Sequence, residues 1–359
     1  MLKYILVIKM SEKTRKKVII GLSGGVDSSV AALLLKQNGY EVIGVTMQLC
    51  NDSLDAITDA KKVAEKLDIP FHCLDLREDF KKYVIDYFAK EYMNGRTPNP
   101  CIECNKHLKF GLMLTKSREL FDADYIATGH YAKIEYNEEN GRYYICESDA
   151  SGKDQTYVLY NLTQEQLRHT LMPLGKYTKE QIREIAKEYG FLNANKKDSQ
   201  EICFVKDNDY AGFIEREYNY KPIKGEFIDT DANVYGLHKG IIHYTVGQRR
   251  GLGLSLKAPL YVKKLDATTN RVILCPQHEL YQDYLICKNV NMITIENLDY
   301  PITVTVKIRY SAPKVKATLI PLDSGDIKVV FDAPQKAITP GQAVVFYNDN
   351  IVIGGGIIV

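Results

Sequence analysis

The chain has 359 residues, of which 45% are hydrophobic and 26% are charged. This composition is ordinary for a soluble globular protein and leaves enough chain for about two or three domains. The formal net charge of +2 excludes a globally basic nucleic-acid-binding protein, so any contact with RNA has to come from local patches. No run approaches the ~18 apolar residues of a membrane span and no signal peptide is recognisable, which predicts a cytoplasmic protein without a membrane partner.

The first residues fit poorly with the segment after them, because a short apolar piece at 2–10 precedes a polar stretch at 11–17. We therefore hypothesise that translation starts at Met10 rather than at Met1. Mass analysis of the N-terminus of the native protein would decide between them.

The first strand-to-helix unit is the most informative part of the chain. An apolar strand at 18–22 runs through Ser23, Gly24 and Gly25 into a helix that begins near Asp27 and Ser28. Glycine admits close approach of a ligand, and the N–H groups at a helix start bind anions, so the stretch predicts a phosphate-binding loop. A tight turn without a ligand is the plainer alternative. Asp27 either caps the helix or reaches a metal ion such as Mg²⁺.

Neither a Walker A ending nor the Gly-x-Gly-x-x-Gly spacing is present in this loop. Instead, Ser-Gly-Gly-x-Asp-Ser resembles the pyrophosphatase loop of enzymes that use ATP to adenylate a substrate carbonyl.

Apolar strands and amphipathic helices then alternate. We predict strands at 42–47, 71–74 and 125–128 and helices at 54–67, 80–92 and 108–120. Such alternation indicates an α/β fold with a doubly wound parallel sheet, whose ligands bind beyond the carboxyl ends of the strands. Met47 and Gly129 lie at two such ends and are candidates to pack on an adenine ring.

The eight cysteines argue for thiol or metal chemistry rather than a disulfide framework. Cys101 and Cys104 follow two prolines, which predicts an exposed loop outside any helix. A further cysteine, Cys203, lies far along the chain. The Cys-x-x-Cys pair alone is compatible with structural zinc, a redox pair, half of an iron–sulfur site or coincidence, and the lack of a second pair disfavours a four-cysteine zinc ribbon.

Helical patterns continue at 164–170 and 178–189, and after about residue 218 short β runs separated by turns take over. These runs predict small β barrels. We expect a catalytic domain at 1–216, a central β-rich domain at 217–282 and a C-terminal β barrel at 283–359, the last two contacting RNA.

Taken together, the motifs resemble the bacterial tRNA-specific 2-thiouridylases along nearly the whole chain. The segments that carry the resemblance are Gly21-Leu-Ser-Gly-Gly-Val-Asp-Ser, Thr97-Pro-Asn-Pro, Cys104-Asn-Lys, Gly129-His-Tyr, Lys153-Asp-Gln, Ile202-Cys-Phe, His243-Tyr-Thr-Val-Gly-Gln-Arg-Arg-Gly-Leu and Pro340-Gly-Gln-Ala.

The resemblance implies ATP-dependent replacement of the C2 oxygen of the wobble uridine by sulfur, in tRNAs for lysine, glutamate and glutamine. Adenylation would turn the poorly reactive uracil oxygen into a leaving group, AMP. ATP with Mg²⁺ and the tRNA are the implied ligands, and an upstream cysteine desulfurase or sulfur-relay protein is the implied sulfur donor.

The resemblance also implies roles for two cysteines. Cys203 matches the residue that carries sulfur as a persulfide, and Cys104 matches the catalytic nucleophile that releases it and leaves a disulfide to be reduced. The remaining five are interpreted as buried small hydrophobes: Cys50, Cys73, Cys146, Cys275 and Cys287.

Position 101 departs from the family pattern, because the best-known members carry aspartate there, associated with the target base. With cysteine in its place, Cys101, Cys104 and Cys203 form a possible ligand set for three corners of a [4Fe–4S] cluster, whose fourth iron would bind sulfide. The persulfide and cluster routes both deliver sulfur to the same carbon, and both stay open.

The remaining candidates fall into two groups. For ATP they are Gly21, Leu22, Ser23, Gly24, Gly25, Val26, Asp27, Ser28, Met47 and Gly129. For the tRNA and its base the resemblance points to Asn99, Pro100, Cys101, His130, Lys153, Asp154, Gln155 and Gln342. Arg309 and Tyr310 are added because their side chains could combine a phosphate contact with stacking on an extruded base. On composition alone, each of these tRNA candidates is a solvated residue or, for His130, a satisfied core histidine.

Two other functions compete with thiolation. An adenylating synthetase or amidotransferase acting on a small carbonyl needs no cysteine in its site, so it would survive loss of Cys104 and Cys203. A non-catalytic RNA-binding module with structural zinc would cleave no ATP, and the intact Ser-Gly-Gly-x-Asp-Ser loop weighs against it.

Overall fold

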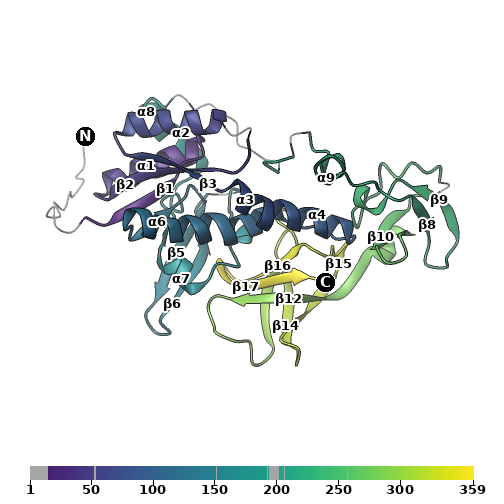
Figure 1. Cartoon of the computed structure of the whole chain (residues 1–359). Coiled ribbons are helices and arrows are strands. Elements are labelled where there is room, and N and C mark those ends of the chain that lie inside the picture. Colours follow the sequence, from purple (N-terminus) through teal and green to yellow (C-terminus); the bar gives the residue numbers. More distant parts are fainter. Residues whose placement is uncertain are drawn as a thin grey trace.

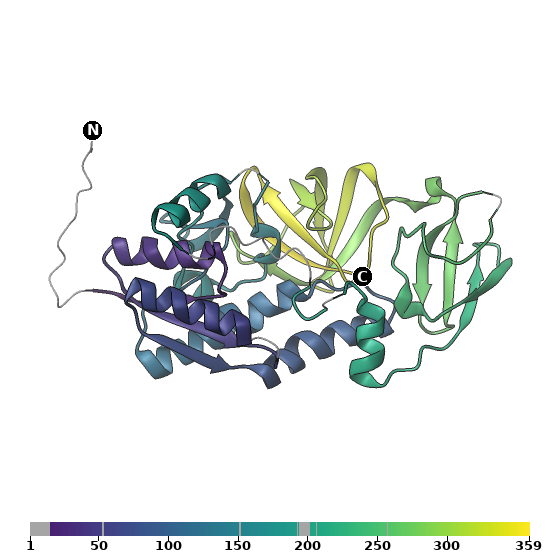
Figure 2. The ribbon, with the colours of Figure 1, turned by 90° about the horizontal axis from the view of Figure 1, so that it is seen from above.

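A computed structural model of the chain describes residues 15–51, 54–150, 152–191, 193, 202–205, 207–256 and 258–359. The hypothesised start at Met10 lies outside these ranges. An N-terminal α/β part and a small green β part lie at opposite ends of an elongated molecule, with the yellow C-terminal barrel between them (Figures 1 and 2). Within the described ranges, no helix combines the length and apolarity that crossing a bilayer requires.

The N-terminal part is built on a five-stranded sheet in the order β3-β2-β1-β4-β7. Every neighbouring pair is parallel, which confirms the predicted doubly wound fold. Its strands are β1 (Lys17–Gly21), β2 (Glu41–Gln48), β3 (Phe71–Asp75), β4 (Tyr125–Ala127) and β7 (Thr170–Leu171).

Two cores cover the two faces of this sheet, because successive side chains of a strand point to opposite sides. Val18 and Ile20 of β1 pack with the helices at 26–37, 54–67 and 179–188. Ile19 packs with the helical region at 77–121 on the other face. The helices of this part are α1 (Val26–Gln37), α2 (Leu54–Leu67), α3 (Arg77–Phe80), α4 (Asp86–Met93), α5 (Pro100–Glu103), α6 (Met113–Phe121), α7 (Gln164–Arg168), α8 (Lys179–Glu188) and α9 (Tyr210–Tyr218), with a short helical turn η4 (Thr156–Val158).

Two of the helical runs contain π-helical segments, a geometry that occurs frequently at functional sites. The segment η2 (Lys81–Ile85) joins α3 to α4, and η3 (Cys104–Leu112) joins α5 to α6. The predicted helices at 80–92 and 108–120 are therefore confirmed as parts of longer continuous runs.

The expectation that two prolines keep 97–104 outside a helix is wrong. Pro100 is the first residue of α5, and the Asn99 side chain caps that helix by accepting a hydrogen bond of 3.1 Å from the Cys101 backbone N–H. A proline is tolerated at the first helical position because the N–H that it lacks has no intrahelical partner there.

The C-terminal barrel includes a hairpin that the sequence pattern did not reveal. The strands of the barrel itself are β12 (Tyr281–Met292), β13 (Ile302–Lys307), β14 (Val315–Pro321), β15 (Ile327–Lys336), β16 (Ala343–Asn348) and β17 (Ile351–Ile358). The barrel is closed by pairing of its first strand with its last, β12 with β17. The hairpin β5 (Ala132–Asn137) and β6 (Arg142–Glu147) joins the same sheet through antiparallel pairing of β6 with β17. The α/β part and the barrel therefore share one sheet.

The central β part is a separate four-stranded sheet in the order β10-β11-β8-β9, which matches the predicted change to short strands after residue 218. Its elements are β8 (Gly225–Ile228), β9 (Val234–His238), β10 (Tyr261–Asp266), β11 (Arg271–Cys275) and the turns η5 (Ile241–His243) and η6 (Gln277–Leu280). Ile242 packs against Phe88 and Tyr92, so α4 anchors this part to the rest.

Candidate functional site

The predicted phosphate loop is closed by its own serines. The Ser28 hydroxyl accepts a hydrogen bond of 3.2 Å from the Ser23 backbone N–H and donates one of 3.1 Å to the Gly25 carbonyl. The Ser29 hydroxyl donates a hydrogen bond of 2.9 Å to the same carbonyl. These contacts fix the loop at the start of α1, where N–H groups face an incoming anion.

Glycine is required at position 24 of the loop. Gly24 has a φ of +71°, and a Cβ there would lie 2.9 Å from the Ala56 carbonyl oxygen and from the Asp59 Cβ. The Asn193 side-chain amide donates hydrogen bonds of 3.0 Å to the Gly24 carbonyl and to the Ser29 hydroxyl. The loop is thus held by α2 on one side and by Asn193 on the other.

The predicted adenine contacts lie at the ends of β2 and β4. Met47 is half-buried and packs against the hydrophobic core beneath the sheet. A Cβ on Gly129 would lie 2.8 Å from the Ser28 backbone nitrogen, so the backbone after β4 lies directly against the start of α1. Gly129 therefore borders the phosphate loop, and the contact of either residue with adenine stays a prediction.

Asp27 does not cap its helix. The N-cap residue of α1 is Gly25, which makes no side-chain cap hydrogen bond. The Asp27 carboxylate instead accepts hydrogen bonds of 2.8 Å from the Lys179 ammonium on both oxygens and one of 2.8 Å from the Tyr131 hydroxyl. The ammonium and the hydroxyl thus hold the carboxylate in place, and coordination of Mg²⁺ by Asp27 stays a prediction.

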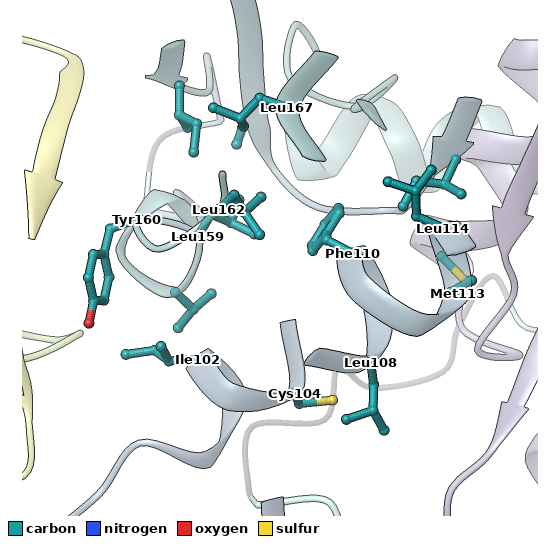
Figure 3. Close-up of a cluster of buried hydrophobic side chains, with 14 of the residues drawn as sticks. Ile102, Cys104, Leu108, Phe110, Met113, Leu114, Leu159, Tyr160, Leu162 and Leu167 are labelled. Carbon is teal, nitrogen blue, oxygen red and sulfur yellow. The ribbon is translucent and has the colours of Figure 1, made fainter. Parts of the chain in front are cut away.

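Cys101 and Cys104 lie on the α5–η3 run, one exposed and one buried. Cys104 packs in the same core as Ile102 and Leu108, and Figure 3 shows its sulfur directed toward Leu108. Burial raises the pKa of the Cys104 thiol, since the surrounding apolar side chains disfavour a thiolate. A thiol held in this way is a weak nucleophile, because the thiolate is the reactive form.

Cys203 lies near Cys101 and Cys104, close enough for a charge on either thiol to raise the pKa of its own thiol. Its neighbour Phe204 anchors it by packing edge-on against Phe80 and Phe88, with ring centroids 5.6 and 5.2 Å apart. Although Cys203 is exposed at the surface, the protein around its sulfur disfavours the thiolate. Loss of solvation of the thiol group, followed by the nearby Cys104 and Cys101, raises the pKa of Cys203 to about 12.

The raised pKa of Cys203 leads to a testable pH dependence. In the folded protein, alkylation of Cys203 by iodoacetamide should accelerate about tenfold per pH unit from pH 7 to 10, because the thiolate fraction keeps rising below a pKa near 12. In denaturant the same thiol should reach a plateau just above its ordinary pKa of about 8.5. Peptide mass spectrometry after timed quenching measures both rates, and a plateau near pH 9 in the folded protein would contradict the pKa assignment.

The thiols and the phosphate loop are joined by one helical run. Met113 begins α6, and its Sδ and Cε lie 3.5 Å from an ideal Cβ on Gly21 at the end of β1. Cys104 begins η3 and Met113 begins α6, nine positions further along the same run. The run therefore links the segment that carries Cys101 and Cys104 to the strand that leads into the phosphate loop.

A turn of the barrel clamps the segment that leads into α5. The Gln342 side-chain amide donates a hydrogen bond of 2.7 Å to the Thr97 carbonyl, and the Thr97 N–H donates one of 2.9 Å to the Pro340 carbonyl. Gly341, at a φ of +91°, would place a Cβ 2.9 Å from the Thr97 nitrogen. Gln342, which is predicted to contact tRNA, is thus hydrogen-bonded in this structure to the segment that leads to Cys101 and Cys104.

The other candidates for the tRNA gather around a second contact between the barrel and the α/β part. The Tyr310 hydroxyl donates a hydrogen bond of 3.1 Å to the Asp154 carbonyl, which brings Arg309-Tyr310 beside the Lys153-to-Gln155 segment. Asp154 has one buried carboxylate oxygen without a hydrogen-bond partner, and burial raises its pKa. Arg309 is exposed and donates to the Lys336 carbonyl at 3.1 Å.

Two of these candidates are occupied by internal contacts. The Gln155 side chain accepts a hydrogen bond of 2.9 Å from the Tyr131 N–H, and its backbone N–H donates one of 3.0 Å to the Tyr131 carbonyl. His130 is buried beside Thr128, 2.7 Å from its hydroxyl, and burial holds the pKa of this histidine well below the ordinary value. Their contact with tRNA stays a prediction.

The cysteines outside the site only partly match the sequence interpretation. Cys146, Cys275 and Cys287 are buried as expected, whereas Cys73 is exposed and Cys50 is half-buried, which corrects their assignment as core residues. All eight cysteines are free thiols. Among the residues that the structure describes, no group of three or more histidine, cysteine or acidic side chains has a geometry that could hold a metal ion. This includes the three candidate cluster ligands, Cys101, Cys104 and Cys203.

Sequence reasoning missed Lys179, Tyr131 and Asn193, which surround the phosphate loop. Two signals were present in the sequence: Tyr131 ends the Gly129-His-Tyr segment, and Lys179 directly follows the Thr178 capping residue of α8, where a cation is unfavourable. Lys179 and Asn193 come from segments far from the loop in sequence, so only the fold brings them together.

Comparison with known families covers nearly the whole chain. A family model described as "tRNA methyl transferase HUP domain" matches residues 16–207. Two further models, "tRNA methyl transferase PRC-barrel domain" and "Aminomethyltransferase beta-barrel domain", match residues 211–276 and 282–358.

Individual relatives extend over nearly the full length. A tRNA-specific 2-thiouridylase MnmA of Clostridium perfringens is 54% identical over 357 residues, covering 96% of this chain and 99% of the relative. The MnmA of Clostridioides difficile is 53% identical over 354 residues, covering 96% and 98%. Among solved structures, an NMN synthetase from Francisella tularensis matches with a TM-score of 0.34 and 18% identity, covering 52% of this chain and 66% of that one. From the sequence identity and coverage of these two MnmA proteins, the chain belongs to the tRNA-specific 2-thiouridylase (MnmA) family.

Proposed function

We propose that this chain uses ATP to replace the C2 oxygen of the wobble uridine with sulfur in tRNAs for lysine, glutamate and glutamine. The observation that supports the proposal most directly is the single helical run from Cys104 to Met113, whose side chain lies 3.5 Å from an ideal Cβ on Gly21, the last residue of β1 before the phosphate loop. The MnmA names of its relatives support the tRNA substrate and the thiolation.

The reaction begins with adenylation. The uracil O2 attacks the α-phosphate of ATP, pyrophosphate leaves, and the O2 now carries AMP as a leaving group. N–H groups of the loop between Ser23 and Asp27 hold the phosphates, since charge-assisted hydrogen bonds to backbone donors stabilise the developing negative charge. The reacting base must be flipped out of the anticodon loop to reach this position.

Sulfur transfer occurs at the thiol end of the site. The terminal sulfur of a Cys203 persulfide attacks C2 and AMP departs. The Cys104 thiolate then attacks the Cys203 sulfur, which releases the thiolated base and leaves a Cys104–Cys203 disulfide. A cellular dithiol reduces that disulfide, and a cysteine desulfurase or sulfur-relay protein reloads Cys203.

A cluster-based variant of the same reaction remains a second candidate because Cys101 occupies the usual aspartate position, and both other thiols lie near it. The arrangement in the described residues does not fit a metal centre, so the steps above involve no cluster.

One experiment tests the function and separates the two routes. The protein is purified without oxygen, its iron and acid-labile sulfide are measured, and thiolation of wobble-uridine tRNA is assayed with ATP and either sulfide or a desulfurase. ATP-dependent 2-thiouridine formation with AMP release supports the proposal, and its absence from both sulfur sources would refute it. About four irons per chain, with activity lost on their removal, would favour the cluster.

A further inference from the structure

Lys179 is a buried lysine beside the phosphate loop. Only 4% of its side chain is exposed, whereas 28% of the Asp27 side chain is. Its ammonium donates to both Asp27 oxygens at 2.8 Å and lies 5.8 Å from the centre of the Tyr131 ring. The ammonium group is therefore fixed in place by a residue of the loop motif itself.

Helix packing alone does not account for a lysine at this position. The start of α8 already has a complete capping box, formed by Thr178 and Gln181. Ile182 and Ala186 supply the apolar contact of α8 with the core. A cation in the first turn opposes the helix dipole, and burying it costs solvation energy that a pair with one carboxylate recovers only in part. Residues that break local rules in this way are expected at functional sites.

The surroundings of the pair indicate what it binds. The backbone N–H groups and glycines at 23–25 form an anion site. Asp27, whose carboxylate is hydrogen-bonded to the Lys179 ammonium, lies two residues further along the chain. An ammonium group has three donors and no acceptor, which suits it to bridge a carboxylate and a phosphate oxygen. The Tyr131 hydroxyl, 2.8 Å from Asp27 Oδ1, fixes the carboxylate from the other side.

We propose that Lys179 binds the phosphates of the nucleotide at this loop, and that Asp27 acts as the positioning residue that holds its ammonium group there. The inference rests on the proposed function, because it concerns the nucleotide of that reaction. It assigns Asp27 a role that differs from metal binding or helix capping.

The test measures ATP binding to the full chain by calorimetry, with EDTA present to remove divalent metal and without tRNA. Lys179→Met should weaken ATP binding by about tenfold to hundredfold, the range of a hydrogen bond to a charged group. Lys179→Arg should recover part of the loss. Lys187→Met is the matched control, because Lys187 is an exposed lysine in the last turn of the same helix, and it should bind ATP as the wild type does.

The single variant leaves the Asp27 carboxylate unpaired, and this charge could by itself repel ATP or destabilise the fold. The double variant Asp27→Asn/Lys179→Met removes both charges and therefore avoids both effects. If Lys179 binds phosphate, the double variant still binds ATP at least about tenfold more weakly than the wild type. Wild-type ATP affinity in the double variant would overturn the inference and leave the pair as a tether between α8 and α1.

The same measurements separate this inference from the proposed function. A wild-type chain that binds ATP with the predicted Lys179 dependence, but thiolates no tRNA, would support the inference and refute only the reaction. A wild-type chain that binds no ATP would refute both.

Discussion

Cys203→Ser and Cys104→Ser are each expected to abolish tRNA thiolation, with the multiple-turnover rate reduced on the order of a thousandfold or more. In the persulfide route each thiol forms a bond that the other residues cannot replace. The two losses should differ in a single-turnover experiment with radioactive sulfur. Cys104→Ser should still load sulfur on Cys203, whereas Cys203→Ser should load none.

Two further serine variants complete this test. Cys73→Ser is the control, because Cys73 is an exposed thiol on β3 that has no assigned role in the site; it should keep wild-type activity. Cys101→Ser should also stay active if the persulfide route operates, whereas joint loss of iron and activity would identify Cys101 as a cluster ligand. Normal turnover in Cys104→Ser or Cys203→Ser would reject both routes and favour an adenylating enzyme without a catalytic thiol.

Gly129→Ala is expected to weaken ATP binding at least about tenfold. The added Cβ would lie 2.8 Å from the Ser28 nitrogen and 2.9 Å from the Asp27 carbonyl carbon, so α1 and the loop before it must move. Overpacking of this kind costs about 1–3 kcal/mol, and here the displaced atoms are those that define the anion site. Isothermal calorimetry with ATP, alongside a thermal melt, measures the two effects separately.

The control is Gly39→Ala, at an exposed turn after α1 where nothing lies within 4 Å of the added Cβ. Gly39 has a φ of +85°, so this variant should lose about 1 kcal/mol of stability without losing ATP affinity. If Gly129→Ala bound ATP as tightly as Gly39→Ala, close packing of the backbone after β4 against α1 would not be what shapes the loop.

Much of the α/β part was predictable because its signals are local. The strand at Lys17–Gly21 and the helix at Val26–Gln37 arise from apolar runs and glycines within a few residues of each other. Parallel order is then expected from the alternation of strands and helices. The phosphate loop was predicted for the same reason, since the serine hydrogen bonds that close it join residues within 23–29. Asn193, Tyr131 and Lys179 reach it from distant segments, and the sequence did not reveal them.

What escaped prediction depends mostly on contacts between distant segments. The segment around Pro100 was interpreted as a loop, although proline at the first helical position favours a helix start. The hairpin at Ala132–Asn137 and Arg142–Glu147 is stabilised by pairing with β17, about two hundred residues further along the chain. No local sequence pattern predicts a pairing over that separation. Lys179 resembles an ordinary surface lysine in the sequence and becomes informative only when its partner is known.

The pairing of β6 with β17 has a consequence for how the protein is made. Cys146 and Ile145 of β6 pair with Ile351 and Val352, and Ile145 and Val352 lie in one hydrophobic core with Tyr157. The ribosome releases β6 well before β17, so one edge of the hairpin stays unpaired until β17 has been synthesised. Unpaired strand edges promote association with other chains. A nascent chain of this protein is therefore exposed to misassembly until β17 emerges, and a chaperone that covers this edge would raise its yield.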